Sequence, residues 1–101
     1  MHHIMTLQEF NSILEDTFVV IDFYTPTCPP CKIIGPIYDT LPDKFSHITF
    51  VKTDCGGKNE IADKYKIGSV PTFLFFSHGK LVHTQYGGNA AELIEACTKT
   101  F

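Results

Sequence analysis

The sequence holds two cysteines three positions apart, Cys28 and Cys31, with two prolines between them. Residues at this spacing on a helix lie about 5–6 Å apart, which is close enough for a disulfide. Pro29 and Pro30 restrict the backbone, so oxidised and reduced forms would differ little in conformation. This spacer suits a bond that is made and broken repeatedly, and we interpret the pair as a redox couple. A pair of ordinary buried thiols is one alternative.

A zinc site is a second alternative, because His78 and His83 complete, with the two cysteines, the ligand count of a Cys2His2 site. The two pairs are separated by residues 32–77, whereas zinc fingers use about 12–15 residues at this point. His78 also falls in a predicted turn and His83 in the middle of a predicted strand. We therefore expect no metal ion.

The elements on either side of the cysteine pair must position it. Residues 18–24 (FVVIDFY) are rich in β-branched and aromatic side chains and predict a central strand buried on both faces. From Cys31, apolar residues recur at helical spacing and predict a helix to about Phe45, with a kink near Pro36. Cys28 would lie at the helix N-terminus, where the helix dipole and the Cys31 N–H favour a thiolate. We predict that Cys28 is the nucleophile and that Cys31 is less exposed.

Asp22 stands inside the apolar strand. Because burial disfavours the charged form of a carboxyl group, we expect a raised pKa that allows proton exchange near neutral pH. Such a group could act as general base for Cys31 through a water molecule. The alternative is a strand-end aspartate held by backbone amides.

The rest of the chain alternates between strand and helix patterns. The other predicted elements are an edge strand at 3–5, a helix at about 6–15, a strand at 48–54, a helix around 61–65, a hairpin of strands 72–77 and 81–86, and a helix after Asn89. This order predicts an α/β fold with a mixed sheet covered by helices on both faces. We expect residues 1–101 to form a single domain.

Composition and charge exclude several classes of function. The formal net charge is −3 and no Lys/Arg cluster exists, which argues against a surface for nucleic acids or anionic membranes. The N-terminus lacks the apolar region of a signal peptide, and no apolar run reaches the roughly 18 residues of a membrane helix. We expect a soluble, cytoplasmic protein in a reducing compartment, where cysteines do not form a stabilising disulfide framework.

Several motifs beyond the cysteine pair share one pattern of spacing. They are residues 20–32 (VIDFYTPTCPPCK), Pro36, residues 70–73 (VPTF), Gly79 and Gly87. Together they resemble the thioredoxin family over essentially the whole length of the chain. The resemblance implies the thioredoxin fold, a central mixed sheet of about five strands flanked by four helices. It also implies a redox site at the amino end of the second helix.

The resemblance assigns roles to individual residues. Cys28 matches the attacking thiol and Cys31 the resolving thiol. Asp22 matches the buried acid beneath the pair, and Lys52 a basic residue that neighbours this acid in some members. Val70-Pro71 matches a peptide bond that is cis in the family and faces the disulfide. The predicted substrate-binding residues are Thr27, Pro29, Pro30, Ile67, Gly68, Val70, Pro71 and Gly87, with the Val70 backbone pairing with substrate like a strand.

The chain departs from the family pattern at two positions. Thr27 replaces the tryptophan that usually precedes the first cysteine, which reduces the flat apolar surface beside the site. Pro29 replaces the usual glycine and gives a spacer similar to those of tryparedoxin and nucleoredoxin. Outside the motif, we interpret Cys55 as an incidental thiol and Cys97 as a core residue. Regulatory oxidation of Cys55, or a disulfide-linked dimer, is the alternative.

The predicted function is that of a thioredoxin-type protein-disulfide reductase that works by dithiol–disulfide exchange. By resemblance, it binds no cofactor and receives electrons from NADPH through a thioredoxin reductase. Implied substrates are disulfide-containing proteins such as peroxiredoxin, methionine sulfoxide reductase or ribonucleotide reductase, and we expect a monomer. The alternatives are a reductase dedicated to a glutathione- or trypanothione-like thiol system and a non-catalytic binding or chaperone module with the thioredoxin fold.

Overall fold

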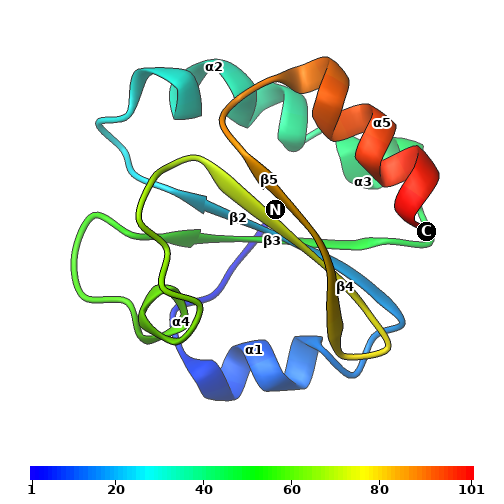
Figure 1. The fold of residues 1–101 in the computed structure, drawn as a ribbon, viewed down its shortest axis with the longest axis horizontal. Helices are drawn as coiled ribbons and strands as arrows, with labels where there is room; N and C mark the ends of the chain where they lie inside the picture. The colour runs from blue at the N-terminus through cyan, green and yellow to red at the C-terminus, as the bar shows by residue number, and fades with distance from the viewer.

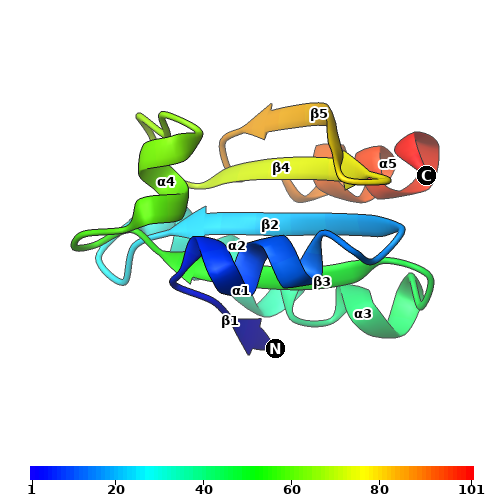
Figure 2. The same cartoon turned by 90° about the horizontal axis from the view of Figure 1, so that it is seen from below.

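A five-stranded mixed sheet runs through the middle of the computed structural model, which describes residues 1–101 (Figure 1). The strands are β1 (His2–His3), β2 (Phe18–Tyr24), β3 (Thr49–Asp54), β4 (Thr72–Ser77) and β5 (Lys80–Tyr86). Their order in the sheet is β1-β3-β2-β4-β5, which Figure 2 shows from below. β1, β3 and β2 are parallel, whereas β4 is antiparallel to both β2 and β5. β2 therefore lies at the centre of the sheet, as predicted.

Helices cover both faces of this sheet. They are α1 (Leu7–Ile13), α2 (Pro29–Tyr38), α3 (Leu41–Lys44), α4 (Glu60–Lys64) and α5 (Ala90–Thr100). α2, α3 and α5 lie on one face, and α1 and α4 lie on the other (Figure 1). The four expected helices are present, with the second divided into α2 and the short α3. None of the helices has the length and apolar character needed to span a membrane.

The structure corrects the bounds of the second helix. α2 ends at Tyr38, whereas the sequence predicted one helix from Cys31 to about Phe45. Pro42 explains the division, because it lacks the N–H that would bond to the Tyr38 carbonyl and its ring would clash with that carbonyl. The break places Asp39 at the C-cap of α2.

Side-chain caps mark the starts of α1 and α5. The Thr6 hydroxyl accepts a hydrogen bond from the Glu9 N–H, and the Glu9 carboxylate accepts one from the Thr6 N–H in return. The Asn89 side chain accepts a bond from the Glu92 N–H at the start of α5. These bonds satisfy amides that the first helical turn leaves without partners, so they fix where α1 and α5 begin.

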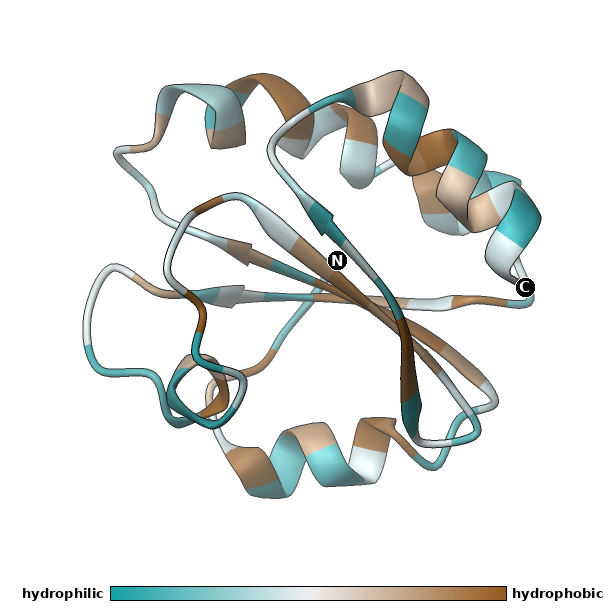
Figure 3. Cartoon of the chain, viewed as in Figure 1, coloured by the Kyte–Doolittle hydropathy of each residue, from teal (hydrophilic) through white to brown (hydrophobic).

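β2 separates two hydrophobic clusters, because successive side chains of a strand point to opposite faces of the sheet. Val20 packs in the cluster under α2, α3 and α5, which also contains the fully buried Cys97, as predicted. Ile21 packs in the cluster under α1 and α4. Figure 3 shows the hydrophobic colour concentrated along the central strands. Asp22 lies two residues after Val20 and therefore faces α2, the helix that carries the cysteine pair.

Candidate active site

Cys28 and Cys31 form a disulfide at the N-terminus of α2, with their Cα atoms 5.2 Å apart. Cys28 is the N-cap, and its sulfur accepts a hydrogen bond of 3.2 Å from the Cys31 N–H, as predicted. Pro29 occupies the first helical position, where an amide N–H has no intrahelical partner. Both cysteines are largely covered, with exposed fractions of 9% for Cys28 and 7% for Cys31. The helix N-terminus therefore supplies a hydrogen-bond donor, the Cys31 N–H, to the Cys28 sulfur. Cys31 is only slightly less exposed than Cys28.

The loop before β4 lies directly against this disulfide. The Val70-Pro71 bond is cis, which confirms the expectation from resemblance. The Cys28 sulfur lies 3.7 Å from the Val70 carbonyl oxygen, a distance at which the reduced thiol can donate a weak hydrogen bond. The Pro71 carbonyl accepts a bond of 2.9 Å from the Gly87 N–H, which ties the loop to the end of β5. The loop before β4 and the end of β5, which are distant in sequence, thus form the rim of the site.

Gly88 contributes to this rim and was missed in the sequence, where Gly87 was selected. A Cβ atom at Gly88 would lie 3.4 Å from both Cβ and the carbonyl oxygen of Pro30, and 3.6 Å from Cγ of Pro71. The absence of a side chain therefore allows the segment after β5 to approach both prolines closely. The Gly-Gly pair before the Asn89 cap was the available signal.

The remaining predicted substrate-binding residues differ in their exposure. Thr27, Pro29 and Pro30 are exposed next to it. Gly68 is exposed, whereas Ile67 is partly buried and packs against the cluster under α1 and α4. Contact of these residues with a substrate stays a prediction.

Asp22 is buried on the face of the sheet that α2 covers, with 2% of its surface exposed. Its Oδ1 atom has no hydrogen-bond partner, which does not support the alternative of a carboxylate held by backbone amides. Burial raises its pKa to about 7; the positive charge of Lys52 lowers this pKa and the negative charge of Asp39 raises it. The carboxyl group can therefore take up or release a proton near neutral pH.

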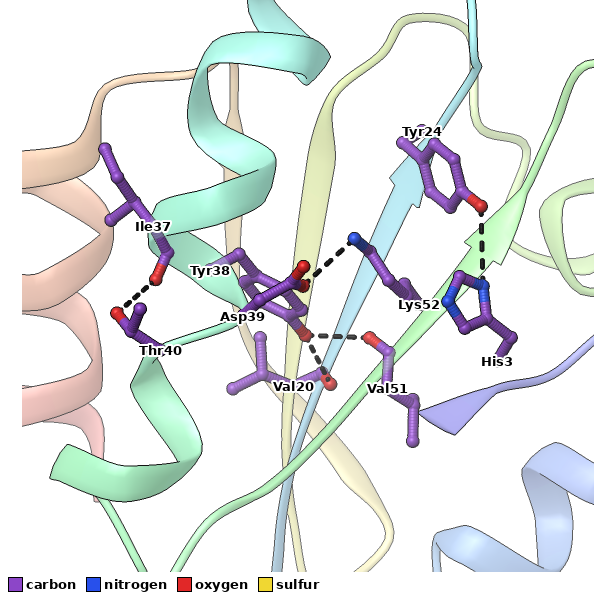
Figure 4. A network of polar contacts seen from close by, with 9 residues as sticks. All are labelled: His3, Val20, Tyr24, Ile37, Tyr38, Asp39, Thr40, Val51 and Lys52. Atoms are coloured by element: carbon purple, nitrogen blue, oxygen red, sulfur yellow. Dashed lines mark hydrogen bonds and ion pairs between the residues drawn. The ribbon is translucent and has the colours of Figure 1, made fainter. Parts of the chain in front are cut away.

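Lys52 lies beside Asp22 on the adjacent strand, in register with it. Its Nζ atom contacts Oδ1 of Asp39 at 3.1 Å and lies 5.1 Å from the ring centroid of Tyr24 (Figure 4). A cleft of about 290 Å³ opens here, and its lining includes Cys31, Asp39 and Lys52. This cleft gives solvent a path toward the inner cysteine. The sequence did not indicate Asp39, which falls inside the helix predicted to run to about Phe45 and not at its end.

Tyr38 joins α2 to the two strands below it. Its hydroxyl lies 3.1 Å from the Val20 carbonyl oxygen and 2.7 Å from that of Val51 (Figure 4), and the side chain is fully buried. Its ring packs against those of Phe50 and Phe73. The hydroxyl has one proton to donate, and the two buried carbonyl oxygens share it.

We expect Tyr38→Phe to lower the free energy of unfolding by about 1–2 kcal/mol, because it removes a buried hydrogen bond to the sheet while keeping the ring. Urea denaturation measures this loss. Tyr86→Phe is the matched control, because Tyr86 is 73% exposed and its hydroxyl stays in water. An equal effect of both substitutions would contradict this role for the Tyr38 hydroxyl.

Cys55 and Cys97 are free cysteines outside the disulfide. Burial raises the pKa of the Cys55 and Cys97 thiols to about 11, so both stay protonated at neutral pH. His78 lies in the β4–β5 turn, where its N–H bonds to the Thr17 carbonyl. This turn is at the opposite end of the sheet from Cys28, about 20 Å away by the length of β2. The zinc alternative is therefore geometrically wrong, and no other cluster of metal-ligating side chains is present.

A mixed sheet with a Cys-Pro-Pro-Cys disulfide at a helix N-terminus and a buried acid beneath it defines the class of thiol–disulfide oxidoreductases. The thioredoxin family model matches residues 1–99. The chain is 41% identical to a thioredoxin of Mycoplasmoides gallisepticum over 88 residues, covering 86% of this chain and 88% of that protein. It is 36% identical to thioredoxin-1 of Saccharomyces cerevisiae over 92 residues, covering 90% and 89%. The chain belongs to the thioredoxin family.

Solved structures agree with this assignment. A Plasmodium falciparum thioredoxin superposes with a TM-score of 0.94 at 30% identity, covering all of both chains. The family and the redox-active cysteine pair together support protein-disulfide oxidoreductase activity. Proteins of this family typically work without a bound cofactor and exchange electrons with a reductase and with disulfide-containing proteins.

Proposed function

We propose that this protein reduces disulfides of other proteins, with Cys28 as nucleophile and Cys31 as resolving thiol. The Cys28 thiolate attacks a substrate disulfide, forms a mixed disulfide and displaces one substrate thiolate, which takes up a proton. Asp22 accepts the Cys31 proton through water, and Cys31 attacks the Cys28 sulfur and displaces the second substrate thiolate. The substrate gains two electrons, and the protein is left with the Cys28–Cys31 disulfide.

The position of the Cys28 sulfur supports this proposal most directly. The sulfur accepts the Cys31 N–H at the helix N-terminus and lies 3.7 Å from the Val70 carbonyl oxygen. The first contact stabilises negative charge on Cys28. The second places the attacking sulfur next to a backbone segment that can pair with an extended substrate.

The finer assignments of partners and location are also proposals. A thioredoxin reductase would restore the dithiol with electrons from NADPH, and peroxiredoxin, methionine sulfoxide reductase and ribonucleotide reductase are candidate substrates. We propose a monomer that works in the cytoplasm. The free thiols of Cys55 and Cys97 are compatible with a reducing compartment of this kind.

The test is the trapping of mixed disulfides. We expect Cys31→Ser to accumulate a covalent complex with a protein-disulfide substrate such as insulin, because the complex forms but nothing resolves it. We expect Cys28→Ser to trap none. Non-reducing electrophoresis and mass spectrometry identify the linked cysteine. Equal trapping by the two variants, or trapping through Cys31, would overturn the assignment of roles.

A further inference from the structure

Lys52 has two acidic neighbours, and its ammonium group contacts only one of them. Lys52 and Asp22 are register partners on β3 and β2, so both side chains lie on the face covered by α2. The Nζ atom nevertheless pairs with Oδ1 of Asp39 at 3.1 Å, and no ion pair joins it to Asp22. Figure 4 shows the Lys52 side chain reaching from β3 toward Asp39 at the end of α2.

The surroundings of Lys52 restrict where its charge can go. Only 11% of its side chain is exposed, compared with 46% for Asp39. The ammonium lies 5.1 Å from the ring centroid of Tyr24 and 6.0 Å from that of Tyr38, so aromatic faces flank it. A largely covered ammonium needs an anionic partner, and the two carboxyl groups nearby are Asp39 and Asp22.

We propose that Asp39 is a positioning residue for proton transfer at the redox site: by holding the Lys52 ammonium, it prevents this charge from pairing with Asp22. The Asp22 carboxyl group is thereby kept able to take up a proton near neutral pH. This inference rests on the role of general base proposed above for Asp22.

The electrostatic effects of Asp39 and Lys52 on Asp22 have opposite signs. Asp39 raises the pKa of Asp22 by its negative charge, whereas Lys52 lowers it. Loss of the Asp39 charge would therefore lower this pKa directly. It would also release Lys52 to turn toward Asp22, which lowers the pKa further. Both consequences act in the same direction, so the sign of the expected change in pKa is defined.

Apart from the two cysteines of the reduced site, the other titratable groups near Asp22 do not compete with this pair of charges. The groups near it are Tyr24 from β2, Lys52 from β3, Cys28, Cys31 and Tyr38 from α2 and its cap, Asp39 from the end of α2, and Cys55 after β3. Tyr24, Tyr38 and Cys55 have raised pKa values and are neutral at pH 7. The register partner of Asp22 on β4 is Phe73, which carries no charge.

The first measurement follows the Asp22 carboxyl carbon of the reduced protein by ¹³C NMR as the pH changes. We expect Asp39→Asn to lower the titration midpoint by about one pH unit. Asparagine has nearly the same shape as aspartate and readily adopts the αR conformation of Asp39, so the helix should be preserved. Asp43→Asn is the matched control: it removes one exposed acid that makes no ion pair, and we expect the midpoint to stay unchanged.

The second measurement asks whether Asp39 acts through Lys52. Lys52→Gln alone should raise the Asp22 titration midpoint. When Asp39→Asn is added to Lys52→Gln, it should lower the midpoint by less than half as much as it does in the wild-type protein. An undiminished effect would show that Asp39 acts only by its own charge and would overturn the proposal. An unchanged midpoint in the single Asp39→Asn variant would overturn it as well.

Activity separates this inference from the proposed function. The rate at which Cys31 resolves the mixed disulfide is measured as a function of pH. In Asp39→Asn, the pH at which this rate rises should move down together with the Asp22 midpoint. An unchanged dependence of the rate on pH would overturn the positioning role. A wild-type protein that fails to reduce insulin disulfides would contradict the proposed function. The titrations would still decide whether Asp39 controls the charge beside Asp22.

Discussion

Cys28→Ser is expected to lower the rate of insulin-disulfide reduction by at least about a thousandfold. The serine hydroxyl is not ionised at neutral pH and does not attack disulfides, so neither the Cys31 N–H nor the helix dipole can compensate for the lost sulfur. A coupled assay that follows thiol release gives the rate. Cys31→Ser should also stop turnover, yet it should release one equivalent of substrate thiol in a burst, because the first attack is intact.

The control for this loss is Cys55→Ser. Cys55 is a free thiol outside the disulfide, and burial raises its pKa to about 11, so it contributes no thiolate at pH 7. Its replacement should change the rate by less than about twofold. A comparable loss in Cys55→Ser would mean that the chemistry is not confined to the pair, and a substantial residual rate in Cys28→Ser would exclude Cys28 as the only nucleophile.

The position of Cys28 could be predicted from the sequence because it depends on local rules. An apolar strand ends at Tyr24 and two prolines precede the helical pattern that begins at Cys31, so Cys28 was expected at the N-terminus of the helix, where the structure has it as the cap. The burial of Asp22 followed in the same way from its place inside an apolar strand. Signals within a few residues of the site were sufficient for both.

The contacts that the sequence did not reveal depend on how segments distant in the chain meet. Asp39 pairs with Lys52 only because α2 ends where it does, and the effect of Pro42 on that end was overlooked. Gly88 meets Pro30 across the rim of the site, which no local pattern encodes. The cis bond at Val70 was expected from resemblance alone, since most X-Pro bonds are trans.

Asp22→Asn is expected to stabilise the protein at alkaline pH while impairing its chemistry. The folded chain holds the Asp22 carboxyl with a pKa of about 7, compared with an ordinary value of 3.8 in the unfolded chain. Between these pH values the folded state binds the extra proton, so Asp22 makes stability fall as the pH rises through this window. The total contribution reaches up to about 4 kcal/mol, because each tenfold difference in proton affinity between the two states corresponds to about 1.4 kcal/mol.

An asparagine has nearly the same shape and no charge to bury, so the variant should lose this pH dependence. We expect equal stability of the two proteins near pH 4 and a stability advantage for Asp22→Asn that grows to a few kcal/mol at pH 8. Urea denaturation at several pH values measures the difference, and Asp43→Asn controls for loss of an exposed acid. A constant difference across this range, or a less stable variant at pH 8, would show that Asp22 does not titrate as proposed.

The same substitution separates stability from activity. The amide cannot accept the Cys31 proton, so resolution of the mixed disulfide should slow by about a hundredfold at pH 7, while attack by Cys28 continues. The variant is then expected to be more stable but to resolve the mixed disulfide more slowly. This combination would show that the unpaired Asp22 carboxyl lowers stability and also supplies the buried base of the reaction.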